Sequence, residues 1–130
     1  MKNTLTDAIL SIKPIYANQI LSGNKKVEFR KRKFKKSVDR VYIYSSSPQK
    51  MMVGYFTIKT IVEDTPTNLW NEFKDVGGID KDSFFEYYKN SEIGYSIVID
   101  KVVSEGEKDP IDFLENFTAP QSYIYLQREK

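Results

Sequence analysis

Apolar and polar residues alternate in short runs along this chain, and the alternation gives way to helical spacing mainly at two places. Apolar runs or a period of two, both typical of strands, occur at residues 8–13, 27–30, 38–44, 51–62, 95–103 and 122–126. Helical spacing occurs at 15–21, between Pro14 and Gly23, and again near 65–90. This pattern predicts an α+β fold, a small mixed β-barrel flanked by helices and carrying a helical insertion near 65–90.

The length and composition predict one domain over residues 1–130. Forty per cent of the 130 residues are hydrophobic, which is enough for a packed core. No run approaches the roughly 18 apolar residues of a membrane span, and the first residues lack the apolar segment of a signal peptide. We therefore expect a cytoplasmic protein that does not enter the membrane. The chain contains no Cys and no His, which excludes thiolate nucleophiles, His-containing triads and zinc sites built from these residues.

Charge is distributed unevenly along the sequence. Residues 1–62 carry 13 Lys and Arg against 3 Asp and Glu, a net charge of +10, whereas residues 63–130 carry 7 against 15, a net charge of −8. Eight of the 20 cations lie between Lys25 and Lys36. A patch of this kind is typical of polyanion binding, although a solvated loop is the alternative. The side chains expected to hold a nucleic-acid backbone are Lys31, Arg32, Lys33, Lys35 and Lys36.

The aromatic residues fall into two groups. The first has helix-face spacing and is assigned to packing: Trp70, Phe73, Phe84, Phe85 and Tyr88. The second consists of strand tyrosines, namely Tyr42, Tyr44, Tyr55, Tyr123 and Tyr125. These either fill the barrel as half-buried residues or form a wall on which single-stranded bases stack.

Two pairs of aspartates carry the weaker signals. Asp80 with Asp82, and Asp109 with Asp112, are better explained as helix caps than as cation ligands, because no loop has the spacing of a dedicated calcium site. A glycine-rich phosphate loop is also missing from the sequence. We therefore predict no metal site and no cofactor. Gly54 lies inside a long strand pattern and predicts a β-bulge.

Three ionic residues follow the Gly23 turn and form the strongest constellation. If residues 27–30 are a strand, Val27 and Phe29 are buried, and Glu28 and Arg30 share the opposite face with Lys26. Lys25 beside Glu28 can bind a polar heterocycle, or its pKa can fall far enough for base catalysis. The alternative is a pair of solvated ion bridges along a strand.

These residues resemble the ASCH domain of the PUA-like superfamily. Its hallmark G-x-K-x-x-E-x-R is met at Gly23, Lys25, Glu28 and Arg30, after a strand that ends in Lys13-Pro14. The similarity continues through residues 42–48 and Gly54 and recurs at 119–123, while residues 65–90 look like an insertion. The resemblance implies a PUA-like β-barrel with a cleft between the barrel and the first helix.

The resemblance also implies a ligand, which is RNA or a nucleotide-like molecule held by its base in the cleft. Lys25 and Arg30 would donate hydrogen bonds, Glu28 would accept them from a base, and Lys13 would reach the same cleft. The full set of expected ligand-binding residues is Lys13, Lys25, Glu28, Arg30, Tyr44, Ser46, Gln121 and Tyr123.

Two other functions follow from the same residues. Some ASCH-like proteins are amidohydrolases of acetylated cytidine, and they use a lysine matching Lys25 to activate a threonine three residues later. Glu28 occupies that later position here, which leaves Ser45, Ser46 or Thr57 as substitutes. Ribonuclease activity is also attributed to the family. Lys25 and Glu28 are therefore the candidate catalytic residues of an enzyme, and in a third interpretation the acidic second half docks a basic partner protein.

Overall fold

A computed structural model describes residues 3–130, and within that range six strands form one mixed sheet. The strands are β1 (Thr4–Ile12), β2 (Val27–Arg30), β3 (Arg40–Ser45), β4 (Met51–Asp64), β5 (Gly94–Lys108) and β6 (Tyr123–Glu129). The helices are α1 (Pro14–Ser22), α2 (Pro66–Phe73) and α3 (Lys81–Tyr87), with a 3-10 turn, η1, at Pro110–Asp112. The predicted α+β fold and the helical insertion are therefore confirmed.

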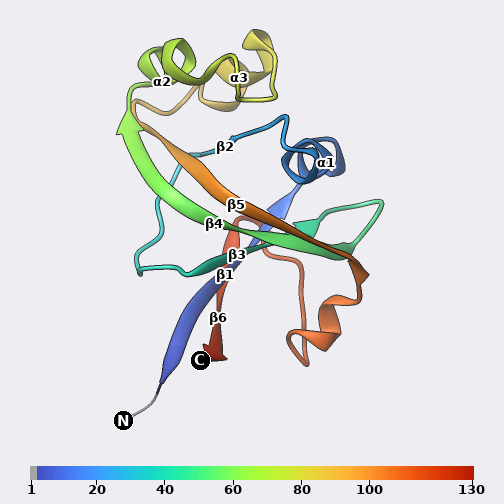
Figure 1. Cartoon of the computed structure of the whole chain (residues 1–130). Helices are drawn as coiled ribbons and strands as arrows, with labels where there is room; N and C mark the ends of the chain where they lie inside the picture. Colours follow the sequence, from blue (N-terminus) through green and yellow to red (C-terminus); the bar gives the residue numbers. More distant parts are fainter. Residues whose placement is uncertain (1–2) are drawn as a thin grey trace.

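The sheet has the strand order β2-β5-β4-β3-β1-β6 and is strongly curved (Figure 1). Only the β1–β3 pair is parallel, and the other four neighbouring pairs are antiparallel. Within the described residues the strand pairing begins at β2 and ends at β6, so the barrel-like sheet stays open between these two strands. A side chain spans the opening, because Arg30 Nη2 on β2 donates to Ser122 Oγ, just before β6, at 3.0 Å. No helix among the described residues is long and apolar enough to cross a membrane.

Local sequence signals explain where the main elements begin and end. Pro14 occupies the first turn of α1, and Gly23 ends that helix in a left-handed conformation with its amide bonded to the Ile20 carbonyl. The register between strands shifts around Met52 and Gly54, where the sequence predicts a bulge. Thr65 and Asp80 accept backbone hydrogen bonds at the starts of α2 and α3, as their positions predict.

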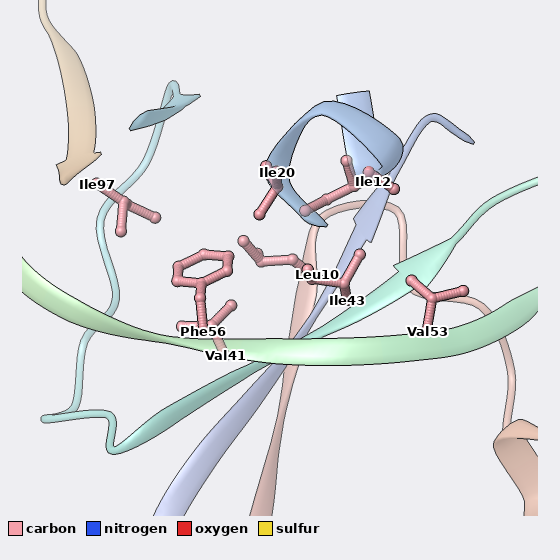
Figure 2. Close-up of a cluster of buried hydrophobic side chains, with 9 residues drawn as sticks. Leu10, Ile12, Ile20, Val41, Ile43, Val53, Phe56 and Ile97 are labelled. Atoms are coloured by element: carbon pink, nitrogen blue, oxygen red, sulfur yellow. The ribbon is translucent and has the colours of Figure 1, made fainter. Parts of the chain in front are cut away.

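Three apolar clusters hold the fold together. The first lies between α1 and the sheet, where Leu10, Ile20 and Phe56 are fully buried and face one another (Figure 2). The second packs α2 and α3 onto β2 around Phe84 and Tyr88, and it takes in the helical aromatic residues that the sequence assigns to packing. The third lies under η1. Each fully buried large side chain stabilises the fold by about 1.5–3 kcal/mol, so the insertion is anchored firmly beside β2.

Candidate functional site

A cavity of about 850 Å³ lies where α1, β2 and α3 meet, and the Lys-Glu-Arg constellation lines it. The end of β1 and the first turn of α1 form one side, and α3 forms the opposite side. Residues 121–122 and the first two residues of the loop after β2 complete the lining. The cavity falls in the size range of small-molecule sites, roughly 300–1,000 Å³. The motif therefore opens onto a concavity.

Lys25 is placed by the turn that follows α1. Its backbone amide donates to the Gln19 carbonyl at 3.0 Å. Its Nζ donates to the Gly77 carbonyl at 2.5 Å and lies 3.8 Å from Glu28 Oε1, and the side chain is only 3% exposed. Burial lowers the pKa of Lys25 below the ordinary 10.5, and the negative charge of Glu28 partly opposes this shift. Lys25 thus links the loop between α2 and α3 to the start of β2, and it places a positive charge beside the Glu28 carboxylate.

The loop between α2 and α3 closes tightly over the stem of Lys25. Gly78 has a φ of +64°, and a Cβ built there would lie 3.0 Å from Lys25 Cβ and 2.3 Å from Gln19 Oε1. Only glycine fits this close approach without displacing its neighbours. The loop that contains Gly77 and Gly78 therefore also shapes the site.

Glu28 lies between two cations and faces the cavity. Oε2 accepts a hydrogen bond from Arg30 Nη1 at 3.2 Å, and Oε1 faces Lys25. The Glu28 side chain is 9% exposed and that of Arg30 is 13% exposed. A carboxylate has about four acceptor positions, and Arg30 occupies one of them while Lys25 lies 3.8 Å away, so acceptor capacity remains for a ligand.

The rest of the cavity is positively charged. Lys13, Lys31 and Arg32 are exposed and line it, together with the buried Lys25 and the half-buried Arg30. Glu86 on α3 is the other acidic residue of the lining. Five cations against two carboxylates favour an anionic ligand.

The predicted ligand-binding residues divide between the cavity and other places. Gln121 lines the cavity with Lys13, Lys25, Glu28 and Arg30, whereas Tyr44, Ser46 and Tyr123 do not. Tyr44 is buried on the other face of the sheet, with its ring centroid 5.0 Å from that of Phe117. Ser46 lies in the turn after β3. Both faces of β3 are covered by other parts of the protein. The alternation therefore predicts which face of the strand carries Tyr44, but it does not predict whether that face borders the cavity.

Tyr123 and Tyr125 lie beneath the basic loop, which we define as residues 31–36. The Tyr125 hydroxyl accepts hydrogen bonds from the backbone amides of Lys35 and Lys36 at 2.8 and 3.1 Å. Tyr123 packs against Phe34 with ring centroids 4.8 Å apart. Lys33, Lys35 and Lys36 are exposed outside the cavity. The two tyrosines thus support the loop and are unavailable as a broad stacking wall.

Lys26 is also placed differently from its strand neighbours. It precedes β2 and is exposed outside the cavity, whereas the alternation predicts that it shares a face with Glu28 and Arg30. Its amide donates to the Val76 carbonyl at 2.8 Å, so this bond fixes the backbone before the strand begins.

Two tyrosines that sequence reasoning missed also line the cavity, Tyr16 on α1 and Tyr87 on α3. Burial raises the pKa of both hydroxyls. The Nζ of Lys31 lies 4.6 Å from the ring centroid of Tyr87, a cation–π contact across the edge of the cavity. The position of Tyr16, one turn before the buried Ile20 and three residues after Lys13, is the signal that points to it. Tyr87 has no such signal, because its helix meets β2 only through tertiary packing.

The hydroxyls proposed as substitutes for the missing threonine do not line the cavity. Ser45 is buried and donates to Gln49 Oε1, while Thr57 Oγ accepts from the Lys101 amide at 3.2 Å. Asp80 and Asp109 accept backbone hydrogen bonds from Ser83 and Ile111, as predicted for caps. Within residues 3–130, no three Asp or Glu side chains gather closely enough to hold a metal ion.

Comparisons with known proteins show the family and the fold of this chain. The ASCH domain profile matches residues 10–109. An ASCH domain-containing ribonuclease from Zymomonas mobilis subsp. mobilis is 26% identical over 128 residues, which cover 95% of this chain and 86% of the relative. The crystal structure of ASCH from Zymomonas mobilis superposes with a TM-score of 0.86 at 25% identity, covering 92% of this chain and 87% of that one. A mutant form of that protein gives the same TM-score at 24% identity, covering 92% and 89% of the two chains.

Proposed function

Because this chain belongs to the ASCH domain family, we propose that it binds single-stranded RNA, with the basic loop on the backbone and one nucleobase in the cavity. A relative of similar length is named a ribonuclease, which supports RNA as the partner. The acidic surface of the second half stays a predicted docking site for a protein partner.

One observation carries this proposal. Lys31 and Arg32 belong both to the basic loop and to the cavity lining, so the positive charge of the loop continues into the cavity. Lys33, Lys35 and Lys36 extend the charge outward from there as exposed side chains. A single-stranded RNA whose phosphates lie along the loop can therefore place one base next to Glu28.

The cavity also has the chemistry that a base requires. The rings of Tyr16 and Tyr87 supply apolar and aromatic surface, and Glu28 supplies a hydrogen-bond acceptor. Stacking of a base on an aromatic ring contributes about 1–3 kcal/mol without regard to sequence. Bases in single strands are open to contact along their Watson–Crick edges, where Glu28 would accept.

The salt dependence of RNA binding tests the role of the loop. Anisotropy of a short labelled single-stranded RNA should show log affinity falling with log salt, by about 0.7 for each phosphate neutralised. Replacing Lys35 and Lys36 by alanine should make that slope shallower by about 1.4. The matched control replaces Lys59 and Lys101 by alanine, because both are exposed on the sheet away from the cavity. Binding that is flat with salt, or equally altered by both double variants, would refute this role.

A second candidate function is RNA cleavage, which the name of the relative and the lowered pKa of Lys25 favour. In such a reaction the 2′-oxygen attacks the adjacent phosphorus, a base removes the 2′ proton, and an acid protonates the leaving 5′-oxygen. Lys25 and Glu28 are the candidates for these proton transfers. End-labelled RNA should be shortened by the wild-type protein and left intact by Lys25→Met. Cleavage retained by both Lys25→Met and Glu28→Gln would exclude this assignment.

A further inference from the structure

The arrangement around Glu28 presents an ordered row of hydrogen-bonding groups to the cavity. The two carboxylate oxygens are acceptors, and each has a cation beside it, Lys25 Nζ at 3.8 Å from Oε1 and Arg30 Nη1 at 3.2 Å from Oε2. The Arg30 guanidinium lies beside Oε2 and donates from Nη1 to Glu28 and from Nη2 to Ser122, which leaves three of its five N–H groups. The row therefore reads acceptor, acceptor, donor.

Lys25 does not extend this row. Its Nζ is directed at the Gly77 carbonyl and is almost fully buried, whereas the Arg30 side chain retains some exposure at the cavity. The row thus has one open donor end, at Arg30, and this asymmetry gives a bound base a single orientation.

The Watson–Crick edges of the four RNA bases differ in how they match this row. Guanine presents an amino N–H, a ring N–H and a carbonyl oxygen in sequence, which is donor, donor, acceptor. Adenine and cytosine each place one amino group beside a ring nitrogen that only accepts, and uracil places one N–H between two carbonyls. A ring acceptor or carbonyl opposite a Glu28 oxygen would leave two acceptors facing each other, which is costly in a buried site.

We propose that the cavity is selective for guanine, with the Glu28 carboxylate accepting from the amino group and ring N–H of the base and Arg30 donating to its carbonyl. This inference rests on the proposed RNA-binding function and names the base that the same site takes. The exposed cations Lys13, Lys31 and Arg32 surround the cavity and suit the phosphates that flank that nucleotide.

The test compares uridine pentanucleotides whose central residue is guanosine, adenosine, cytidine, uridine or inosine, measured by anisotropy with the wild-type protein. The guanosine pentamer should bind about tenfold more tightly than the adenosine, cytidine and uridine ones, which is the lower part of the discrimination that a two-bond base contact gives. Inosine lacks only the amino group, so its affinity should fall between guanosine and the rest.

Glu28→Gln assigns the preference to its side chain, because the amide keeps the shape and loses one acceptor. The tenfold preference should disappear in this variant, while the salt dependence of binding remains. Glu72→Gln, an exposed change on α2 outside the cavity lining, is the matched control and should keep the preference. If Glu28→Gln does not fold, the wild-type comparison of guanosine with inosine still decides the proposal.

The outcomes separate this inference from the function on which it rests. Equal binding of all pentamers, preference for another base, or equal affinity for guanosine and inosine overturns guanine selection and leaves RNA binding intact. Guanine preference that survives Glu28→Gln overturns the role of Glu28. Failure of every pentamer and of longer single-stranded RNA to bind overturns the proposed function itself.

Discussion

Two buried carboxylates lie at opposite parts of the sheet and differ in how fully they are paired: Asp7 lies beside Arg128, and Glu28 lies between Lys25 and Arg30. Asp7 is 0% exposed, and its oxygens accept from Arg128 Nε at 2.7 Å, Arg128 Nη2 at 3.3 Å and the Arg40 amide at 3.0 Å. Arg128 also contacts Asp39. Glu28 has one hydrogen bond, from Arg30 at 3.2 Å, and a looser contact with Lys25 at 3.8 Å.

The difference separates a structural carboxylate from one that can bind a ligand. Asp7 holds β1 to β6 and to the start of β3, and its partners occupy both oxygens within the packed sheet. Glu28 retains unused acceptor positions and lines a cavity. Because unused hydrogen-bonding capacity in a buried group costs free energy, it marks a place where a ligand can stabilise the protein.

The largest expected effect is on stability at the Asp7 site. Asp7→Asn should lower the free energy of unfolding by about 3 kcal/mol, because it leaves Arg128 facing an uncharged amide. We take the low end of the range for a broken buried pair because Arg128 is a quarter exposed. Glu28→Gln should cost only about 1.5 kcal/mol, since Glu28 accepts a single hydrogen bond at 3.2 Å and its contact with Lys25 is longer, at 3.8 Å. Urea unfolding at neutral pH measures both, and equal losses would break the comparison.

A smaller effect should appear in the pH dependence of stability. In the folded protein burial lowers the pKa of Lys25, whereas the unfolded chain keeps the ordinary value of 10.5. Between these two pKa values the unfolded state binds more protons, so the free energy of unfolding gains a contribution that rises with pH up to 10.5. Lys25→Met should lack this rise.

The measurement is the difference in unfolding free energy between wild type and Lys25→Met across the alkaline range. The raised pKa values of Tyr16, Tyr87 and Tyr88 act in the opposite direction above pH 10, and they largely cancel in this difference. Glu28→Gln removes the negative charge that partly opposes the lowering of the Lys25 pKa. In this variant the rise of unfolding free energy with pH should therefore begin at a lower pH. A difference that does not change with pH would show that Lys25 is not desolvated as described.

The parts of the site that sequence predicted are those set by local geometry. Gly23 ends α1, and a strand at 27–30 puts Glu28 and Arg30 on one face, so the glycine turn and the strand period suffice to bring these side chains together. The pairing of Asp80 with the start of α3 is likewise local. Side chains only a few residues apart can take few relative positions, because the backbone conformation fixes them, and for this reason these contacts could be predicted.

The parts that escaped prediction depend on contacts between distant residues. The carbonyl that holds Lys25 belongs to Gly77, 52 positions away, and Tyr87 reaches the cavity because α3 packs on β2. Tyr44 lies outside the cavity for a related reason, since alternation gives the face of a strand but does not say what covers that face. β3 is buried on both faces, so its tyrosines pack inside the protein. The open edge between β2 and β6 also depends on the whole sheet.

The smallest expected effect lies in the basic loop. This loop follows Arg30, which contacts Glu28, and the chain then continues to Asp39, which contacts Arg128 near Asp7. Tyr125→Phe removes the hydroxyl that accepts from the Lys35 and Lys36 amides. Because water can replace it at this exposed position, stability should fall by only about 0.5 kcal/mol. Hydrogen exchange at these two amides should accelerate about twofold, which is the change in the opening equilibrium that about 0.5 kcal/mol produces. Tyr123→Phe is the comparison variant, because the Tyr123 hydroxyl contacts the Lys33 carbonyl at 3.5 Å and the Tyr125 hydroxyl at 3.4 Å, and its loss leaves the Tyr125 hydroxyl in place. Unchanged exchange in Tyr125→Phe would mean that the Tyr125 hydroxyl does not hold the loop, and that ring packing such as that of Tyr123 on Phe34 is enough to restrain it.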